Sequence, residues 1–190
     1  MKTPSQHSAF YSNKHYKMQK TLQLIRRATM SPADIMKGVN VPDGVKYLVF
    51  TDASGQSDTA AAGIGIVITT AEGHVLHEES HIIDDQDIAN STKRLETYAA
   101  LVAMQRVPDD KVMVIRDNIN TVKHLLRVSA GQRLSRKMHN LDLWKVIEES
   151  VGGHPGVHAQ WIPSNAGNLG NELADTAARK NRNRPTRLHN

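Results

Sequence analysis

Hydrophobic and polar positions along the chain form two kinds of periodic segment. Short apolar or alternating runs bounded by turn residues predict five strands, at 46–52, 61–70, 74–83, 111–117 and 157–162. Longer segments of helical composition predict four main helices, at 90–107, 118–127, 138–151 and 170–180. The resulting order, three strands followed by alternating helices and strands, indicates an α/β domain with a mixed sheet covered on both faces.

Two of the predicted strands end on an aspartate. Leu48, Phe50 and Asp52 alternate onto one face of the first strand, and Asp117 has the same relation to the fourth strand. If these strands are parallel neighbours joined by a right-handed crossover, both aspartates lie at the cleft outside their carboxyl ends. For each aspartate alone, a local role is the simpler alternative: an Asx-turn for Asp52 and a helix N-cap for Asp117.

Two further acids lie on predicted helices. Glu96 has alanines at i+3, i+4 and i+7, so its helix face is small and apolar, as expected where a helix packs closely against a neighbour. Pairing with Lys93 is the alternative explanation. Asp175, in the sequence NELAD, is taken alone an ordinary surface acid of a helix.

Several carboxylates brought together repel one another unless a divalent cation neutralises them. The chain has no cysteine, so a metal site must use oxygen or imidazole ligands. Oxygen ligands favour Mg²⁺, with Mn²⁺ as a substitute, and two such ions roughly 3.5–4 Å apart are an arrangement suited to phosphodiester cleavage. The sequence therefore suggests a two-metal site.

Charge is distributed unevenly along the 190 residues. Residues 1–45 carry seven Lys/Arg against two Asp/Glu, residues 46–178 carry twelve against seventeen, and residues 179–190 carry five against none. Basic ends thus flank an acidic body. Such arms attract nucleic-acid phosphates, and the alternative is a solvated terminus that improves solubility.

The same patterns predict three parts of the chain. Residues 1–45 are expected to be a basic, loosely ordered extension with a short helix within 31–38, residues 46–182 the folded domain, and residues 183–190 a basic tail. An organellar transit peptide is an alternative for the acid-poor N-terminus. No segment resembles a membrane span, and we expect an intracellular protein, with cytoplasm, nucleus and organelle left open.

At this point the sequence resembles ribonuclease H, type 1. The matching motifs occur in the family's order across about residues 47–178: TDASG, AGIGIVI, RLETYAAL, RDN, NLDLW and WIPSNAGNLGNELAD. The resemblance implies an RNase H-like fold, a five-stranded mixed sheet of order 3-2-1-4-5 with helices on both faces. It also implies metal-dependent endonucleolytic hydrolysis of the RNA strand of RNA–DNA hybrids, giving 5′-phosphate products.

By motif position, Asp52, Glu96, Asp117 and Asp175 are similar to the family's four catalytic, metal-binding acids. Substrate contacts are implied for Ser91, Asn118 and Asn140, for which helix capping is the alternative. A basic loop could also grip phosphate through Arg127, Arg133, Arg136 and Lys137. Trp144 and Trp161 are expected in the core. The expected partner is the hybrid, with the chain acting as a monomer or as part of a larger reverse-transcriptase polyprotein.

One departure from the family pattern concerns catalysis. Asn165 occupies the loop position where the family usually has a histidine, and His154 and His158 lie upstream of it. Slow turnover is therefore expected. Two alternatives follow: a catalytically weakened nucleic-acid-binding module, or a related nuclease that acts on DNA. Ser54 argues against a proofreading exonuclease, which would have a second acid at that place.

Overall fold

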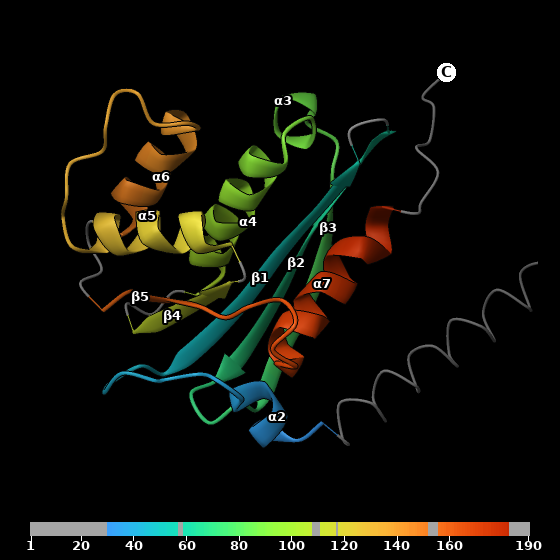
Figure 1. Cartoon of the computed structure of the whole chain (residues 1–190), viewed down its shortest axis with the longest axis vertical. Helices are drawn as coiled ribbons and strands as arrows, with labels where there is room; N and C mark the ends of the chain where they lie inside the picture. The colour runs from blue at the N-terminus through green and yellow to red at the C-terminus, as the bar shows by residue number, and fades with distance from the viewer. Residues whose placement is uncertain (1–29, 57–58, 108–110, 117, 152–155, 183–190) are drawn as a thin grey trace, which may run out of the picture. The chain divides into compact units, whose positions relative to one another are not determined.

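Five strands form one mixed sheet in the order β3-β2-β1-β4-β5, which confirms the expected topology (Figure 1). The three strands at one side are antiparallel, whereas β1, β4 and β5 are parallel. Their bounds are β1 Tyr47–Gln56, β2 Thr59–Thr70, β3 Val75–Ile83, β4 Val112–Arg116 and β5 His158–Trp161.

The computed structural model describes residues 30–56, 59–107, 111–116, 118–151 and 156–182. Every element described here belongs to the unit Pro32–Asn190. Both basic arms lie outside the described residues for most of their length. Within the described ranges, no helix has both the length and the apolar character needed to cross a bilayer.

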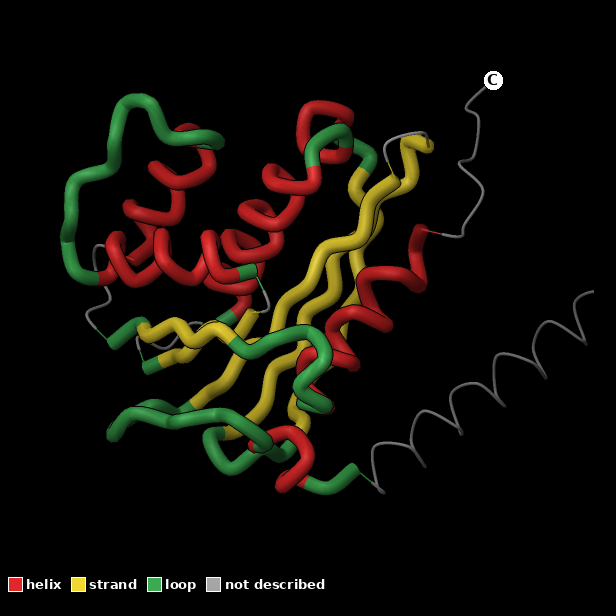
Figure 2. Tube along the Cα trace, viewed as in Figure 1, coloured by secondary structure: helices red, strands yellow, loops and turns green. Residues whose placement is uncertain are grey.

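Helices cover both faces of the sheet (Figures 1 and 2). On one face, α4 (Thr92–Arg106) packs on β1 and β2, and α5 (Ile119–Ser129) packs on β4 and β5, with α6 (Leu141–Val151) against both helices. On the other face, α7 (Leu169–Arg182) lies across β1, β2 and β3. Two short helices complete the fold, α2 (Pro32–Met36) and α3 (Gln86–Ala89).

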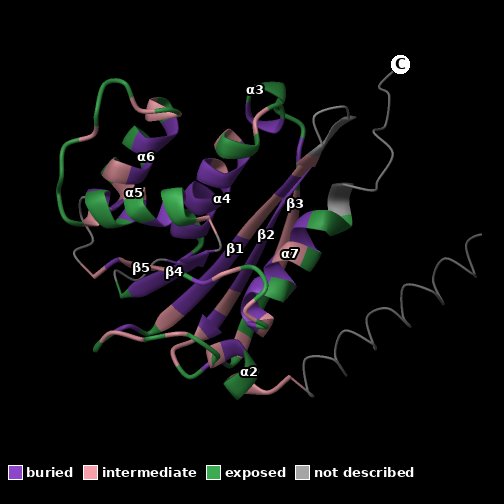
Figure 3. Cartoon of the chain, viewed as in Figure 1, coloured by how far each residue is buried: buried purple, intermediate pink, exposed green. Residues whose placement is uncertain are grey.

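The central strands and α4 form the interior of the domain (Figure 3). All five residues of β4 are buried, as expected of a strand covered on both faces. Helix α4 is buried around most of its circumference because the sheet, α3, α5 and α6 surround it. Glu96 therefore lies on a helix whose side chains have little access to solvent.

The segment that precedes β1 packs against the folded domain. The compact unit starts at Pro32, within the N-terminal extension predicted for residues 1–45. The short helix expected within 31–38 is present as α2, and its Ile35 is fully buried. Asn168, just before α7, donates its amide to the carbonyl oxygens of Ile35 at 2.6 Å and Lys37 at 2.8 Å. These contacts join residues far apart in sequence, which local patterns do not reveal.

Candidate active site

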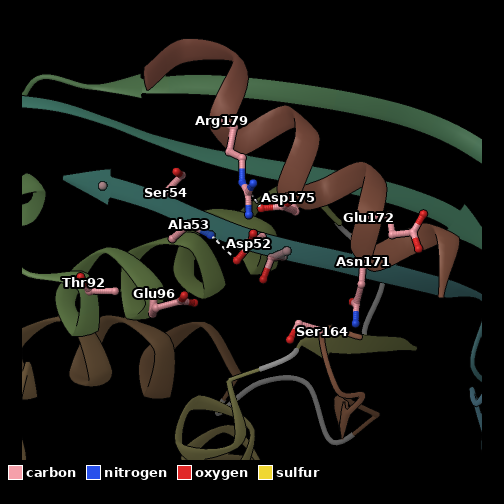
Figure 4. A pocket seen from close by; sticks show the side chains of 12 residues that line it. Asp52, Ala53, Ser54, Thr92, Glu96, Ser164, Asn171, Glu172, Asp175 and Arg179 are labelled. Atoms are coloured by element: carbon pink, nitrogen blue, oxygen red, sulfur yellow. Dashed lines mark hydrogen bonds and ion pairs between the residues drawn. The ribbon is translucent and has the colours of Figure 1, made fainter. Parts of the chain in front are cut away.

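Three of the four predicted acids line one cleft beside the middle of β1 (Figure 4). Asp52 comes from β1, Glu96 from α4 and Asp175 from α7, so both helical layers and the sheet contribute. The cleft has a volume of about 460 Å³. Its other lining residues are Thr51, Ala53, Ser54, Gly55, Thr92, Ser164, Asn171, Glu172 and Arg179.

The β-strand itself positions Asp52. Strand β1 continues to Gln56, so Asp52 lies within a strand and the Asx-turn alternative is wrong. Its Oδ1 accepts the backbone N–H of Ala53 at 2.8 Å. Gly65 is its partner on β2. Because strand backbone is stiff, Asp52 is anchored on a rigid element.

Glu96 is buried, with 7% of its surface exposed. The alanines at i+3, i+4 and i+7 are fully buried, as its helix face predicted. The ion pair of its carboxylate is with the Nη2 of Arg116, at the end of β4, and not with Lys93 as the alternative proposed. The Nη1 of Arg116 also donates to the Glu96 carbonyl oxygen at 2.8 Å. Arg116 was not singled out from the sequence.

Asp175 is the most open of the three acids. Its side chain is 38% exposed, and its Oδ1 lies 2.6 Å from the Nε of Arg179, one helical turn further along α7. Glu172 and Arg179 line the cleft beside it and were missed from the sequence. Their spacings of i−3 and i+4 from Asp175 place them on the same helix face, which is the signal that could have found them.

Asp117 lies outside the described residues. The parallel pairing of β1 with β4 is described as far as Phe50 and Ile115, each two residues before its aspartate. The N-cap of α5 is Asn118, whose side-chain oxygen accepts the backbone N–H groups of Asn120 and Thr121, both at 3.1 Å. The capping role considered for Asp117 therefore belongs to its neighbour.

The expected substrate-binding residues lie at helix starts. Ser91 is the N-cap of α4, with its hydroxyl oxygen 3.4 Å from the N of Arg94. Asn140, at φ 57°, donates its amide to the carbonyl oxygen of Lys93 at 3.1 Å and to the hydroxyl of Thr97 at 3.2 Å. Capping therefore accounts for Ser91 and Asn118 structurally. Asn118 and Asn140 nevertheless line one common pocket, which borders α4, α5 and α6.

The remaining predicted residues lie in two regions. Asn165 is exposed in the loop between β5 and α7, and His158 lies on β5, whereas His154 is outside the described residues. Three of the four cations of the basic loop, Arg127, Arg133 and Lys137, line a separate pocket after α5. His124 lies in both this pocket and the one lined by Asn118 and Asn140. Burial, followed by the charge of Arg127, lowers the pKa of His124 and favours its neutral form.

The donor chemistry of the cleft fits a hard divalent cation. Its described acids present only carboxylate oxygens, which are the ligands that Mg²⁺ and Mn²⁺ prefer. No group of three or more His, Cys, Asp or Glu side chains is arranged to hold a metal ion within the ranges that the structure describes. Two of the acids are paired with arginines, so the carboxylates already have cationic partners.

An ion pair outside the cleft connects α4 to α6. Arg94 donates its Nη1 to Oδ1 of Asp142 at 2.9 Å, and its Nη2 contacts the second oxygen. The hydrogen bond from Arg94 lowers the pKa of the Asp142 carboxyl. Both residues belong to motifs quoted above, and their pairing gives these motifs a structural role in docking α6.

We expect Arg94→Ala to lower the free energy of unfolding at pH 7 by about 0.5 kcal/mol, a small value because the Asp142 side chain is largely exposed. The folded pKa of Asp142 is depressed, so the stabilisation is complete above its unfolded value near pH 4. It is lost as the pH falls through the lower folded value. Urea titrations at several pH values should show the difference between wild type and variant closing below pH 4. A difference independent of pH would contradict this pairing.

The mixed 3-2-1-4-5 sheet, with helices on both faces and a cleft lined by carboxylates from β1, α4 and α7, is an RNase H-like α/β fold. The RNase H family model matches residues 45–183. The chain belongs to the RNase H family.

A curated relative is similar in sequence, and two solved structures are similar in fold. Ribonuclease HI of Haemophilus influenzae is 25% identical over 150 residues, covering 73% of this chain and 90% of the relative. LC11-RNase H1, solved in complex with an RNA/DNA hybrid, superposes with a TM-score of 0.54 at 23% identity, covering 71% of this chain and 98% of that one. The foamy viral protease-reverse transcriptase, also solved with a hybrid, gives 0.60 at 17% identity, over 76% of this chain and 22% of that one.

Proposed function

We propose that this protein is a divalent-metal-dependent endonuclease that hydrolyses the RNA strand of RNA–DNA hybrids and leaves 5′-phosphate ends. The observation that carries the proposal is the convergence of Asp52, Glu96 and Asp175, from three separate elements, on one cleft. The names of the relatives and the hybrid in two of the similar structures support the substrate.

Asp52, Glu96 and Asp175, together with Asp117, would hold two Mg²⁺ ions, for which Mn²⁺ can substitute. Such a pair, when bound, activates a water molecule and stabilises the leaving 3′ oxygen. The contribution of the chain is a set of anionic oxygens carried by a strand and two packed helices, which keeps them in place without further reorganisation. Arg116 and Arg179 would offset only part of the charge of four carboxylates, so bound metal ions would relieve the remaining repulsion.

Substrate would be held by the surface next to the cleft. Asn118 and Asn140 line one pocket and offer amide donors suited to a phosphate, and Ser91 lies at the start of α4. Arg127, Arg133 and Lys137 would attract the backbone of the duplex without reading its sequence. A hybrid is distinguished from duplex DNA by its 2′-hydroxyls.

The central experiment is incubation of the full chain with a labelled RNA–DNA hybrid, duplex RNA and duplex DNA, each with Mg²⁺ or Mn²⁺. The proposal predicts cleavage of the hybrid alone, on its RNA strand, with 5′-phosphate products and none in the presence of a chelator. Cleavage of duplex DNA would favour a related nuclease. Hybrid binding without any product would favour a module that has lost catalysis, for which Asn165 at the usual histidine position is the motivation.

The loop before α7 gives a prediction of its own. We expect Asn165→His to raise turnover on the hybrid about tenfold, less than a well-placed general acid or base contributes, because the loop is exposed. Asn165→Gln, which keeps an amide, is the control and should match wild type. An unchanged rate in the histidine variant, measured in single-turnover and steady-state assays, would mean that this loop takes no part in proton movement or product release.

The chain would act on its hybrid as a monomer or as one domain of a larger reverse-transcriptase polyprotein. The similarity to a protease-reverse transcriptase, of which the matched part is 22%, supports the second arrangement. The genes adjoining the one that encodes this chain distinguish the two.

A further inference from the structure

Arg116 is a buried cation at the edge of the proposed active site. It is the last residue of β4, and its side chain is fully buried. The carbonyl oxygen of Arg116 accepts the N–H of Ile162, which fixes this end of β4 against the neighbouring chain segment. An arginine keeps its positive charge in a protein, so a buried one requires a partner of opposite charge.

Glu96, one of the proposed metal ligands, is such a partner. Nη2 of Arg116 pairs with the Oε2 of Glu96, while Nη1 donates to the carbonyl oxygen of the same residue at 2.8 Å. Two contacts from one planar guanidinium to the carboxylate and backbone of one residue define the orientation of that residue. Glu96 is therefore anchored through its side chain and its backbone.

The arginine that lines the cleft, Arg179, is far more exposed than Arg116. Arg179 is 61% exposed and pairs with Asp175 along the surface of α7, so it can move into solvent when a cation approaches. Arg116 is fully buried between β4 and α4 and has no comparable route to solvent. Its charge therefore stays beside Glu96 whether or not a metal ion is bound.

We propose that Arg116 is a positioning residue whose permanent charge fixes the Glu96 carboxylate and weakens divalent-metal binding at the cleft. This inference rests on the proposed function, because it takes Glu96 to be a metal ligand. One oxygen of Glu96 remains engaged by the guanidinium, which leaves the other for a metal ion. The site then depends on the remaining carboxylates, and on the phosphates of the substrate, for much of its affinity.

A neighbouring arginine lowers the proton affinity of a carboxylate by a factor of about ten to a thousand, and its charge acts in the same direction on a metal cation. We expect the lower end here because the cleft is open to solvent. Removing the charge of Arg116 should therefore tighten metal binding about tenfold. It should also leave the Glu96 carboxylate buried without its partner, so the metal-free variant should have a lower Tm than wild type. Added metal should then raise the Tm of the variant more than that of wild type.

The test is calorimetric titration of Mn²⁺ into the full chain without nucleic acid, together with melting curves in a chelator and in Mn²⁺. The variants are Arg116→Met, which removes the charge, Arg116→Lys, which keeps it, and Arg179→Met as the matched exposed control. We expect a Kd about tenfold lower for Arg116→Met and within about threefold of wild type for the other two. Should Arg116→Met not fold, Arg116→Gln, which is neutral but retains a donor, replaces it.

Equal or weaker Mn²⁺ binding by the neutral variants would overturn the role of Arg116, and so would an equal gain in Arg179→Met. Cleavage of a labelled hybrid by the wild type, measured separately, tests the proposed function. A protein that cuts no nucleic acid but shows the tenfold difference in Kd would retain the Arg116 inference and lose the nuclease proposal. If the wild type cuts the hybrid but every variant has the same Kd for Mn²⁺, the nuclease proposal stands and the Arg116 inference fails.

Discussion

Asp52→Asn should abolish cleavage of the hybrid, reducing the rate by at least about a thousandfold. The substitution removes an anionic oxygen from the strand that supports the cleft, and a metal-bound transition state loses several kcal/mol of stabilisation when a ligand charge is lost. About 4 kcal/mol corresponds to a thousandfold in rate. Single-turnover cleavage in saturating Mg²⁺ and Mn²⁺ measures the effect directly.

The same variant should be at least as stable as wild type without metal. Asp52 shares its cleft with Glu96 and Asp175, so removing one negative charge reduces their mutual repulsion. Melting curves in a chelator should show an equal or higher midpoint, and the rise produced by added Mg²⁺ should shrink. Loss of activity together with a much lower midpoint would instead indicate a structural role.

Asp87→Asn is a suitable control for this experiment. Asp87 is exposed in the first turn of α3 and does not line the cleft, so the substitution makes the same chemical change outside the site. Its cleavage rate should equal that of wild type. Cleavage by Asp52→Asn at the control's rate would end the assignment of Asp52 as a metal-binding acid.

The sequence predicted those elements whose periodicity is local. Apolar or alternating runs bounded by turn residues identified all five strands, and the strand order implied by the family resemblance, with β1 beside β4, is confirmed. The four-residue helix α3 was missed because a single turn carries too little periodicity to be recognised. Trp144 is buried as expected, whereas Trp161 is 42% exposed, so its core assignment was wrong. It ends β5, an edge strand whose other residues are only partly buried.

The acids of the candidate site could be predicted from the sequence, but the arginines that pair with them could not. The positions of Asp52, Glu96 and Asp175 follow from strand and helix patterns together with a family resemblance. Arg116 lies in a run that is otherwise apolar, and an arginine at the end of a strand is usually solvated. Only the packing of α4 on the sheet brings it to Glu96, twenty residues earlier. Burial of a charge is a tertiary property that neither local pattern nor composition encodes.

The close approach of α7 to the sheet gives the second large effect. Gly65 is the strand partner of Asp52, and a Cβ added to it would lie 2.0 Å from the carbonyl oxygen of Ala174 and 2.6 Å from the N of Ala178. Both are backbone atoms of α7, which cannot move aside as a flexible side chain could. Glycine at this position therefore allows the helix that carries Asp175 to reach the strand that carries Asp52.

Gly65→Ala should destabilise the protein by about 3 kcal/mol, the upper part of the usual cost of overpacking, which corresponds to a fall of about 6–12 °C in Tm. Below the new Tm, the folded variant should cleave the hybrid more slowly than wild type. The reason is that α7 must shift to make room for the added methyl group, and it carries Asp175 with it. Gly55→Ala is the matched control: its added Cβ would have no neighbour nearer than 3.7 Å, an ordinary contact. If both variants had the same Tm as wild type, close packing of α7 against β2 would not be needed to bring the two aspartates into one cleft.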